Sequence, residues 1–206
     1  LVSGGHTQLL IVRGVGKYSL LGSTVDDAAG EAFDKVAKMI GFGYPGAAKL
    51  EEAARNGDST RFALPHPMAG RSNCDFSFSG LKTAVRNHYD SLVDSDSETK
   101  DLADLCASFQ RAISETICDR SQWAINQYKN FYPEGNTFVL AGGVAANKYL
   151  CREITNLANE NDMVVKVPPS SLCTDNGAMI AWAGLEYLRL GKSSQLDFAP
   201  RPRWPL

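Results

Sequence analysis

Two glycine pairs, each directly after an apolar run, are the residues of this sequence most suited to chemistry. Gly4-Gly5 follows the apolar start of the chain, and Gly142-Gly143 follows residues 138–141. Glycine permits a sharp turn and a close ligand approach because it has no Cβ. The second pair also leads into a helical pattern, whose first amides are free to hold an anion. Together the pairs predict one nucleotide or phosphate held between distant parts of the chain.

Each loop also has a purely structural interpretation. Ser3-Gly4-Gly5 could form an ordinary hairpin turn, or it could point its amides at a phosphate, with the Ser3 and Thr7 hydroxyls as further donors. Asn147 could offer its amide to a ribose or base edge, or it could cap the helix that follows. The residues alone leave both alternatives open.

Acidic residues form the second group of candidates. Asp27, Glu31 and Asp34 recur at i, i+4 and i+7 and so share one helix face, which is either a solvated stripe or a place where Asp34 accepts hydrogen bonds from ligand hydroxyls. Asp175 precedes the last predicted helix, where a cap or a metal ligand would suit it. One carboxylate does not hold a metal alone, and none of the three histidines has paired ligand spacing.

The elements that must position these residues follow from periodicity and glycine breaks. Strands are predicted at 8–13 and 18–25, and a helix begins at Asp26-Asp27 and ends before Gly41. Residues 42–100 form a loop-rich helical insertion that ends in a polar connector at 94–100. A long helix carries an apolar face from 102 to 117, and strands at 137–141 and 163–167 alternate with helices from about 145 and over 175–190. This order predicts an α/β layer on a mixed sheet.

Bulk properties exclude several classes of protein. The 206 residues are 44% hydrophobic and 21% charged, which is typical of a globular chain. The longest apolar stretches fall well short of the ~20 residues that span a membrane. A net charge of −2 excludes nucleic-acid binding by bulk electrostatics. Five scattered cysteines without CxxC spacing favour a reducing compartment.

The ends of the sequence carry two further expectations. Leu1 already lies inside an apolar run, so we expect a fragment that lacks an N-terminal part. The tail at 198–206 is too rich in proline for a helix and too aromatic for a free linker. We therefore expect residues 191–206 to dock on a surface that this chain does not carry.

Six motifs in order along the whole chain resemble the TsaD family of tRNA threonylcarbamoyladenosine synthases. They are LVSGGHTQ at 1–8, DDAAGEAFDK at 26–35, YPG at 44–46, FSFSGLKT at 76–83, AGGVAAN at 141–147 and CTDNGAMIA at 173–181. The segment at 61–79 and the PRWPL ending resemble the bacterial and organellar branch. Membership of that branch implies the cytoplasm or, for an organellar protein, the mitochondrial matrix.

The resemblance implies a fold and a reaction. The fold is that of the actin-like ATPase and sugar kinase superfamily (ribonuclease-H-like), with residues 1–190 as the second of two lobes. The reaction moves the threonylcarbamoyl group from threonylcarbamoyl-AMP to the N6 amine of the adenosine 3′ of the anticodon, in tRNAs that read codons starting with A. The implied partners are tRNA, a paralogous TsaB-like subunit and a TsaE-like ATPase.

The resemblance also assigns roles to residues. Its motif places the adenylate against Leu1, Val2, Ser3, Gly4 and Gly5. Substrate contacts are implied for Asp34 and Asn147, and Asp175 is implied as a ligand of one divalent metal ion, iron or zinc. Ala47 stands where the family commonly has a substrate-facing glycine, so its added methyl is expected to crowd the ligand or restrict the backbone.

One departure from the family pattern limits what this chain does. The family's two histidine ligands lie upstream of any residue present here, so the chain carries one metal ligand of three. We therefore expect it to bind iron or zinc poorly and to transfer nothing on its own. Three other functions are considered: a phosphotransferase or ATPase of the same superfamily, a metalloprotease, which the absence of a His-Glu-x-x-His motif disfavours, and a binding lobe without activity.

Overall fold

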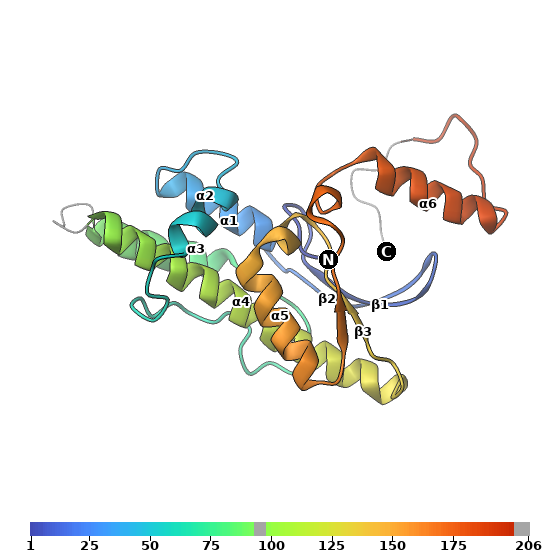
Figure 1. Cartoon of the computed structure of the whole chain (residues 1–206), viewed down its shortest axis with the longest axis horizontal. Helices are drawn as coiled ribbons and strands as arrows, with labels where there is room; N and C mark the ends of the chain where they lie inside the picture. The colour runs from blue at the N-terminus through green and yellow to red at the C-terminus, as the bar shows by residue number, and fades with distance from the viewer. Residues whose placement is uncertain (93–97, 200–206) are drawn as a thin grey trace.

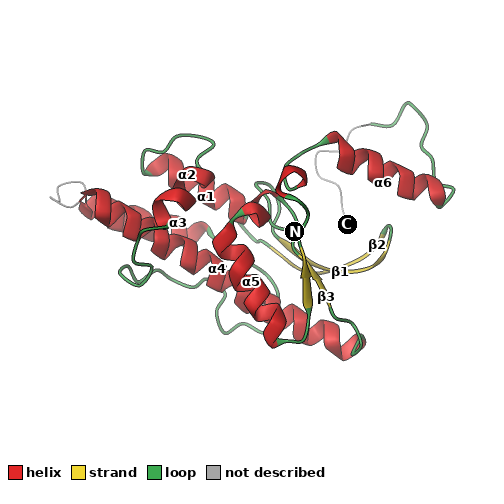
Figure 2. Ribbon diagram, in the orientation of Figure 1, coloured by secondary structure: helices red, strands yellow, loops and turns green. Residues whose placement is uncertain are grey.

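A mixed α/β architecture forms within residues 1–92 and 98–199, the part of the chain that the computed structural model describes (Figures 1 and 2). Within these residues it has six α-helices, two short 3-10 helices and four strands. The order is β1 (Gln8–Gly14), β2 (Lys17–Ser23), α1 (Ala29–Met39), α2 (Ala47–Ala54), α3 (Ser79–Leu92), α4 (Glu98–Phe131), β3 (Thr137–Val139), η1 (Gly143–Ala146), α5 (Lys148–Glu160), β4 (Val164–Lys166), η2 (Ser170–Leu172) and α6 (Gly177–Arg189).

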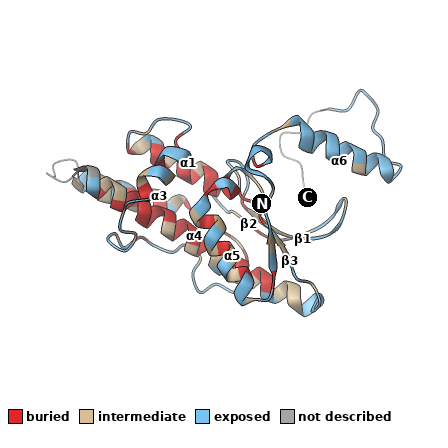
Figure 3. Cartoon of the chain, in the orientation of Figure 1, coloured by how far each residue is buried: buried red, intermediate tan, exposed pale blue. Residues whose placement is uncertain are grey.

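The main hydrophobic core lies where α1, α2 and α3 pack against α4, which runs along the long axis of the molecule (Figures 1 and 3). The apolar face predicted for α1 is buried there: Phe33 meets Phe109 of α4 edge-on, with ring centroids 5.3 Å apart. Such edge-to-face pairs contribute about 0.5–1.5 kcal/mol beyond the area they bury. The core thus fixes α1, and with it the helix start that faces the glycine loops.

The four strands form two separate pairs, where the sequence predicts one mixed sheet. β1 pairs with β2 antiparallel, and β3 pairs with β4 parallel. Leu1 and Val2 connect them, because Gln8 N–H donates to Leu1 O at 2.9 Å and Val2 N–H donates to Ala141 O at 2.7 Å. Beyond these two residues, no strand joins β1 to β3 within the described part of the chain. The prediction of a single mixed sheet is therefore wrong for these residues.

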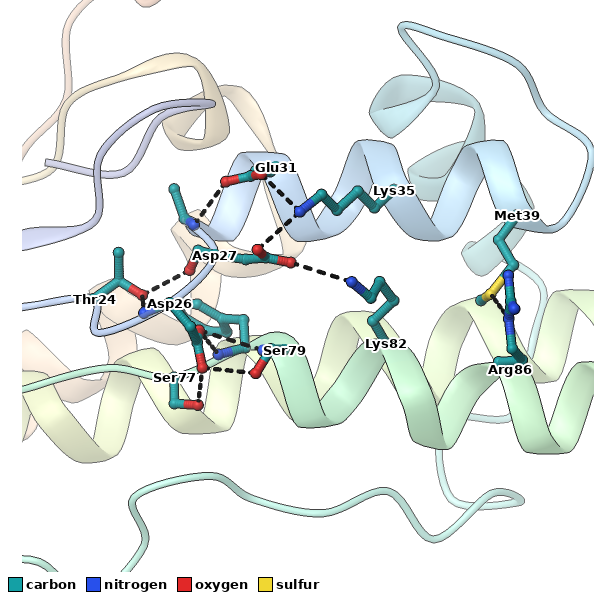
Figure 4. A network of polar contacts seen from close by, with 12 residues as sticks. Thr24, Asp26, Asp27, Glu31, Lys35, Met39, Ser77, Ser79, Lys82 and Arg86 are labelled. Carbon is teal, nitrogen blue, oxygen red and sulfur yellow. Dashed lines mark hydrogen bonds and ion pairs between the residues drawn. The ribbon is translucent and has the colours of Figure 1, made fainter.

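The start of α1 differs from the prediction, which placed Asp26-Asp27 at its first turn. The helix begins at Ala29, and Asp26 instead accepts hydrogen bonds from the backbone of Phe78 (2.8 Å) and from the hydroxyl and N–H of Ser79 (Figure 4). Ser77 donates its hydroxyl to the same carboxylate. Asp26 therefore joins the start of α3 to the start of α1, a contact between residues about 50 positions apart that no local rule foresees.

The remaining boundaries shift by smaller amounts. The polar connector predicted at 94–100 lies partly outside the described residues, and from Glu98 onward it belongs to α4. A 3-10 turn precedes α5, so the helix expected from about 145 begins at Lys148. The last helix begins at Gly177 because Asn176, and not Asp175, accepts the capping bond from Met179 N–H at 2.9 Å.

The C-terminal part of the chain stands apart from the core. No residue of α6 is buried, although the helix carries large apolar side chains (Figure 3). Residues 191–199 of the expected docking tail are exposed, and residues 200–206 of it lie outside the described part of the chain. Among the described helices, none combines the length and the apolar character that crossing a membrane requires.

Candidate functional site

The two glycine loops lie in direct contact. Val2 N–H donates to Ala141 O at 2.7 Å, and Val144 N–H donates back to Val2 O at 3.1 Å. Gly142 has φ +105°, and a Cβ on it would lie 2.3 Å from Val2 O. Only glycine fits there without displacing the first loop. The predicted pairing of the loops is confirmed as a contact; that they hold a ligand stays a prediction.

The N-terminal turn of α1 meets the same place. Gly30 N–H donates to Ser3 O at 3.0 Å, and a Cβ on Gly30 would lie 2.7 Å from that oxygen. Ala29 N–H donates to the Thr7 hydroxyl at 2.8 Å. The first free amides of α1 are therefore used to hold the first loop, and three segments far apart in sequence converge at Val2 and Ser3.

The hydroxyls of Ser3 and Thr7 already have hydrogen-bond partners within the fold, and that they also donate to a phosphate stays a prediction. Ser3 Oγ accepts from His6 N–H at 3.0 Å and from Gly5 N–H at 3.3 Å. Thr7 is buried and accepts from Ala29 N–H. The hairpin-turn interpretation of this loop is correct. Gly4 and Gly5 remain exposed, with no atom within 4 Å of a Cβ position on either, and among the described residues nothing accepts from Gly4 N–H.

The acidic stripe divides into two parts with different partners. Lys35 pairs with Asp27 at 2.8 Å and with Glu31 at 2.7 Å, and Lys82 approaches Asp27 at 3.7 Å (Figure 4). These exposed and half-exposed pairs contribute at most about 1 kcal/mol each. The structure thus places Lys82 beside a carboxylate.

Asp34, the third acid, serves the start of α2. Its Oδ1 accepts from Gly46 N–H at 2.9 Å and from Ala47 N–H at 3.1 Å. Helix starts have free amides, and Gly46 as N-cap has no side chain to satisfy them. Asp34 does so from α1. Its other oxygen, Oδ2, takes no hydrogen bond from the described residues and is not a buried orphan, so it is open to a further donor.

Ala47 lies at the first position of α2, half-buried against the main core. The preceding Gly46 is the tighter position, since a Cβ there would lie 2.5 Å from the Cβ of Ala37. The bond between Tyr44 and Pro45 just before it is cis. The Ala47 methyl is thus partly accommodated by packing, and the backbone N–H of Ala47 donates to Asp34.

Asn147 combines a cap with a buried contact. Its Oδ1 accepts from Leu150 N–H at 2.9 Å, which caps α5, and its Nδ2 donates to Gln110 Oε1 at 2.9 Å. Both side chains are buried. The capping interpretation is correct, and the contact with Gln110 of α4 is one that sequence reasoning missed. The sequence signal for this contact is a glutamine directly after Phe109, in a part of the helix that is otherwise largely apolar.

A polar pocket of about 320 Å³ opens next to this pair, between α2, α4 and the start of α5. Its wall includes Gln110, Glu51, Tyr149 and Arg152. Glu51 accepts from Lys148 N–H at 2.9 Å, so a side chain of α2 reaches the start of α5. Sequence reasoning missed Glu51 because nothing in its spacing links it to a residue 97 positions away.

These contacts form a closed circuit. Ser3 bonds to α1, Asp34 of α1 bonds to the start of α2, Glu51 of α2 bonds to the start of α5, and the turn before α5 bonds back to Val2. Hydrogen bonds therefore link, one to the next, the segments that carry Leu1–Gly5, Asp34, Ala47 and Asn147. Free amides, one open carboxylate oxygen and a polar pocket can bind a phosphorylated, hydroxyl-bearing ligand.

Asp175 does not join this circuit through any hydrogen bond or ion pair. It is exposed and lies two residues before α6. In the described part of the chain, no three His, Cys, Asp or Glu side chains gather as a metal site would require. His66 lies 3.3 Å from Glu115, and His88 packs on Phe62. The described residues therefore do not make a metal site by themselves.

The buried thiols are unsuited to nucleophilic catalysis. Burial raises the pKa of Cys106 and that of Cys118 to about 12. A thiol attacks as its thiolate, which is scarcely populated near neutral pH at such a pKa. These two thiols are therefore poor candidates for a nucleophile.

Comparison with known proteins gives a consistent result. Residues 1–182 match the family model described as TsaD, tRNA N6-adenosine threonylcarbamoyltransferase. Proteins of that name are 55% identical over 206 residues in Rhodospirillum rubrum and in Paramagnetospirillum magneticum, and 51% identical over 208 residues in Brucella ovis. Each match covers 100% of this chain but only 57%, 59% and 57% of the relative, respectively. The chain thus spans little more than half the length of these relatives.

Proposed function

Because the chain belongs to the TsaD family of tRNA N6-adenosine threonylcarbamoyltransferases, we propose that its joined glycine loops form part of a threonylcarbamoyl-AMP site. In the whole protein this site transfers the threonylcarbamoyl group to N6 of an adenosine in tRNA, the one 3′ of the anticodon. The observation that carries the proposal is the contact of Val2 with Ala141 and Val144, which places both loops at one site.

The reaction requires binding and orientation more than acid–base groups from this chain. The adenine N6 attacks the carbonyl carbon of the mixed anhydride, a C–N bond forms, and the C–O bond to the phosphate of AMP breaks. The amine loses one proton, and AMP leaves as a stable anion. Fixing two reactants in line replaces a bimolecular encounter by an effectively unimolecular step.

The phosphate of the adenylate is assigned to the glycine loops. Gly4 N–H and Gly143 N–H have no acceptor among the described residues, and the surroundings of Gly4 and Gly5 are open. Amides of this kind hold anions without a charged side chain. The leaving group is also an anion, so the same amides stabilise the negative charge that grows on the phosphate as the bond breaks.

The hydroxyls and the base are assigned to the acids and the pocket. Asp34 Oδ2 is the acceptor open to ligand hydroxyls, while Oδ1 keeps α2 in place. The pocket bordered by Gln110, Glu51 and Tyr149 receives the nucleoside, and Asn147 fixes one wall of it through Gln110. Its volume of about 320 Å³ is at the lower end of the range typical for small-molecule sites.

The rest of the assembly lies outside this chain. In this proposal residues 1–190 are one lobe of an actin-like ATPase fold and residues 191–206 dock on the other lobe. Asp175 supplies one ligand of a divalent iron or zinc ion, and the remaining ligands come from the rest of the protein. tRNA, a TsaB-like subunit and a TsaE-like ATPase are the partners, in the cytoplasm or the mitochondrial matrix.

The test uses the whole protein with ATP, threonine, bicarbonate, the adenylate-forming enzyme, the partner proteins and tRNA. Nucleosides are then analysed by mass spectrometry. Threonylcarbamoyladenosine in the tRNA supports the proposal, whereas a phosphorylated product formed without tRNA would support a phosphotransferase instead. Asp34→Asn keeps an oxygen for the α2 amides but removes the charge, and we expect a loss of about 10- to 100-fold in kcat/KM.

Asp162→Asn is the matched control, because Asp162 is exposed after the end of α5 and takes part in none of the contacts of the site. The substitution removes the same charge. The backbone at this position has φ +54°, a conformation that asparagine tolerates. Equal activity of the Asp34→Asn and Asp162→Asn proteins would contradict the role given to Asp34.

A further inference from the structure

The polar pocket between α2, α4 and the start of α5 has a buried end and a charged rim. Three of its lining residues are at most 6% exposed, namely Ala54, Ala107 and Gln110. Its basic lining residues are all exposed, namely Arg55, Lys148 and Arg152. The buried end therefore offers two methyl groups and one amide, a lining that suits a flat, largely apolar ring with a few polar atoms.

A chain of two hydrogen bonds fixes the orientation of the Gln110 amide. Asn147 Oδ1 accepts from the backbone N–H of Leu150 at 2.9 Å, so this end of the Asn147 amide must be its oxygen. The other end is its NH2 group, which donates to Gln110 Oε1 at 2.9 Å. Because Oε1 is the atom that faces Asn147, Gln110 presents Nε2 elsewhere. The backbone of α5 thus decides which end of the Gln110 amide is free.

The free end of this amide is a donor without a partner. Among the described residues, none accepts a hydrogen bond from Gln110 Nε2. This atom is also not one of the four fully enclosed side-chain atoms that lack a partner there, so it keeps access to the pocket that Gln110 lines. Buried polar groups are satisfied in the great majority of native structures, and a donor in a pocket wall is satisfied by what fills the pocket.

The donor matches a nucleobase better than a phosphate. The adenine ring carries three unprotonated nitrogens, N1, N3 and N7, and each accepts a hydrogen bond in the plane of the ring. A neutral amide held in one orientation selects such an acceptor by direction and adds no charge to the buried end of the pocket. The phosphate, by contrast, is assigned to the backbone amides of the glycine loops.

We propose that Gln110 recognises the base of the bound nucleotide: its Nε2 donates to one ring nitrogen of adenine, and Asn147 orients it for this bond. The inference rests on the proposed function, which seats the nucleoside of the adenylate in this pocket. Gln110 is then the residue that contacts the ligand, and Asn147 acts on the base through Gln110.

The test measures the affinity of the whole protein for AMP and for 1-deaza-, 3-deaza- and 7-deaza-AMP, in each of which a C–H group replaces one ring nitrogen. Isothermal titration calorimetry at pH 8 gives the four values of Kd. The analogue without the contacted nitrogen leaves Gln110 Nε2 unsatisfied. We expect that analogue to bind about 10-fold more weakly than AMP, and the other two to bind nearly as AMP does.

Gln110→Glu removes the donor and keeps an oxygen that accepts from Asn147. At pH 8, far above the ordinary glutamate pKa of about 4.3, the new carboxylate has no proton to donate. Its charge weakens all four nucleotides alike, so the readout is the ratio of Kd between the sensitive analogue and AMP. This ratio should fall from about 10 in the original protein to about 1.

Asn147→Asp reaches the same atom without a change at Gln110. Aspartate also caps a helix start, so Leu150 N–H keeps its acceptor. The second aspartate oxygen cannot donate to Gln110 Oε1, so Gln110 should turn its NH2 group toward it and present Oε1 to the pocket. The ratio should again fall to about 1 or below, for the same analogue.

Asn130→Asp is the matched control, because Asn130 is exposed near the end of α4 and does not line the pocket. It makes the same change from amide to carboxylate, and the ratio should stay at about 10. A ratio that also stays there in Gln110→Glu and Asn147→Asp would overturn the proposal, since a residue that only supports the fold weakens every nucleotide by the same factor. Should Gln110→Glu fail to fold, Asn147→Asp carries the comparison.

The original protein alone gives two further outcomes. Equal affinity for AMP and all three analogues would overturn the role of Gln110 and leave the nucleotide site in place. Failure to bind AMP at all would overturn the proposed nucleotide site, and the role of Gln110 with it. Transfer to tRNA is not measured in this experiment, so its outcome is separate from that of the transferase assay.

Discussion

The region around α4 and the region of α6 use similar side chains in opposite ways. In the first, Phe33, Phe109 and Leu105 are at most 2% exposed and pack between helices. In the second, Ile180, Trp182 and Leu188 are 63–66% exposed. Figure 3 shows the contrast between a buried body and an exposed terminal helix.

The polar groups of the two regions differ in the same way. Arg120 of α4 is fully buried, and its guanidinium donates to the backbone oxygens of Arg71 and Asn73 and to Asp119. The polar contacts of α6 are an exposed pair, Arg189 with Glu186, and the cap by Asn176. Burial of groups from distant segments thus stabilises the body, whereas these polar contacts of α6 lie within the helix and at its cap.

Truncation of an aromatic ring in each region should separate the two most clearly. Phe109→Ala removes a fully buried ring that contacts Phe33, and it should lower the free energy of unfolding by about 3–5 kcal/mol. Trp182→Ala removes a larger ring that is 63% exposed, and it should change the same quantity by less than about 0.5 kcal/mol. Urea unfolding followed by circular dichroism measures both, and similar losses would show that α6 is packed in solution.

Adjacent glycines in the second loop provide a finer contrast. Gly142→Ala forces a Cβ to 2.3 Å from Val2 O at φ +105°, and it should destabilise the chain by about 2–3 kcal/mol. Gly143→Ala is the control, since the nearest atom to its Cβ position is 4.0 Å away, and about 1 kcal/mol or less is expected. Thermal unfolding compares the two, and equal effects would argue against the contact between the loops.

The carboxylate of Asp26 should give a pH-dependent effect. Burial alone would raise its pKa, but hydrogen bonds from Ser77, Phe78 and Ser79 outweigh burial and lower the pKa below its ordinary value of 3.8. Its contribution is therefore present above about pH 4 and is lost as the pH falls through the lower, folded-state pKa. Asp26→Asn should destabilise the chain by about 1 kcal/mol at pH 7, because the site is partly exposed.

Unfolding free energies at pH 7 and pH 3 test this expectation. The gap between the original chain and Asp26→Asn should narrow at the lower pH. A gap that stays constant would mean that the carboxylate charge does not hold the starts of α1 and α3 together.

The smallest effect is expected at Asp175, which is exposed and has no hydrogen-bond or ion-pair partner among the described residues. Asp175→Ala should change stability by less than about 0.5 kcal/mol. Zinc titrated into this chain by calorimetry should bind weakly, and equally in both proteins, because one carboxylate makes a poor site. Stoichiometric zinc that is lost with Asp175→Ala would contradict this expectation.

Local patterns predicted the elements with useful accuracy where the sequence itself supplies the signal. Strands near 8–14 and 17–23, the apolar face of α1 and the start of β3 at Thr137 were all predicted, because glycine breaks and apolar spacing act over short distances. Helix starts were less accurate. Asp26 and Asp175 both resemble caps in sequence, yet Asp26 bonds to residues near 78, and Asn176 caps α6 instead.

The sequence by itself determined the family, the two glycine loops and the residue types that meet there, since these depend on motif order and on the conformations glycine allows. Only the tertiary structure decided which groups are already used. The Ser3 and Thr7 hydroxyls bond to backbone groups of the fold, and one oxygen of Asp34 bonds to the start of α2. Gln110 bonds to Asn147, and Glu51 bonds to the residue after it. The physical reason is that each of these bonds except the one at Ser3 joins segments at least 12 residues apart. The choice of partner therefore follows from how α1, α2, α4 and α5 pack, which no short window of sequence contains.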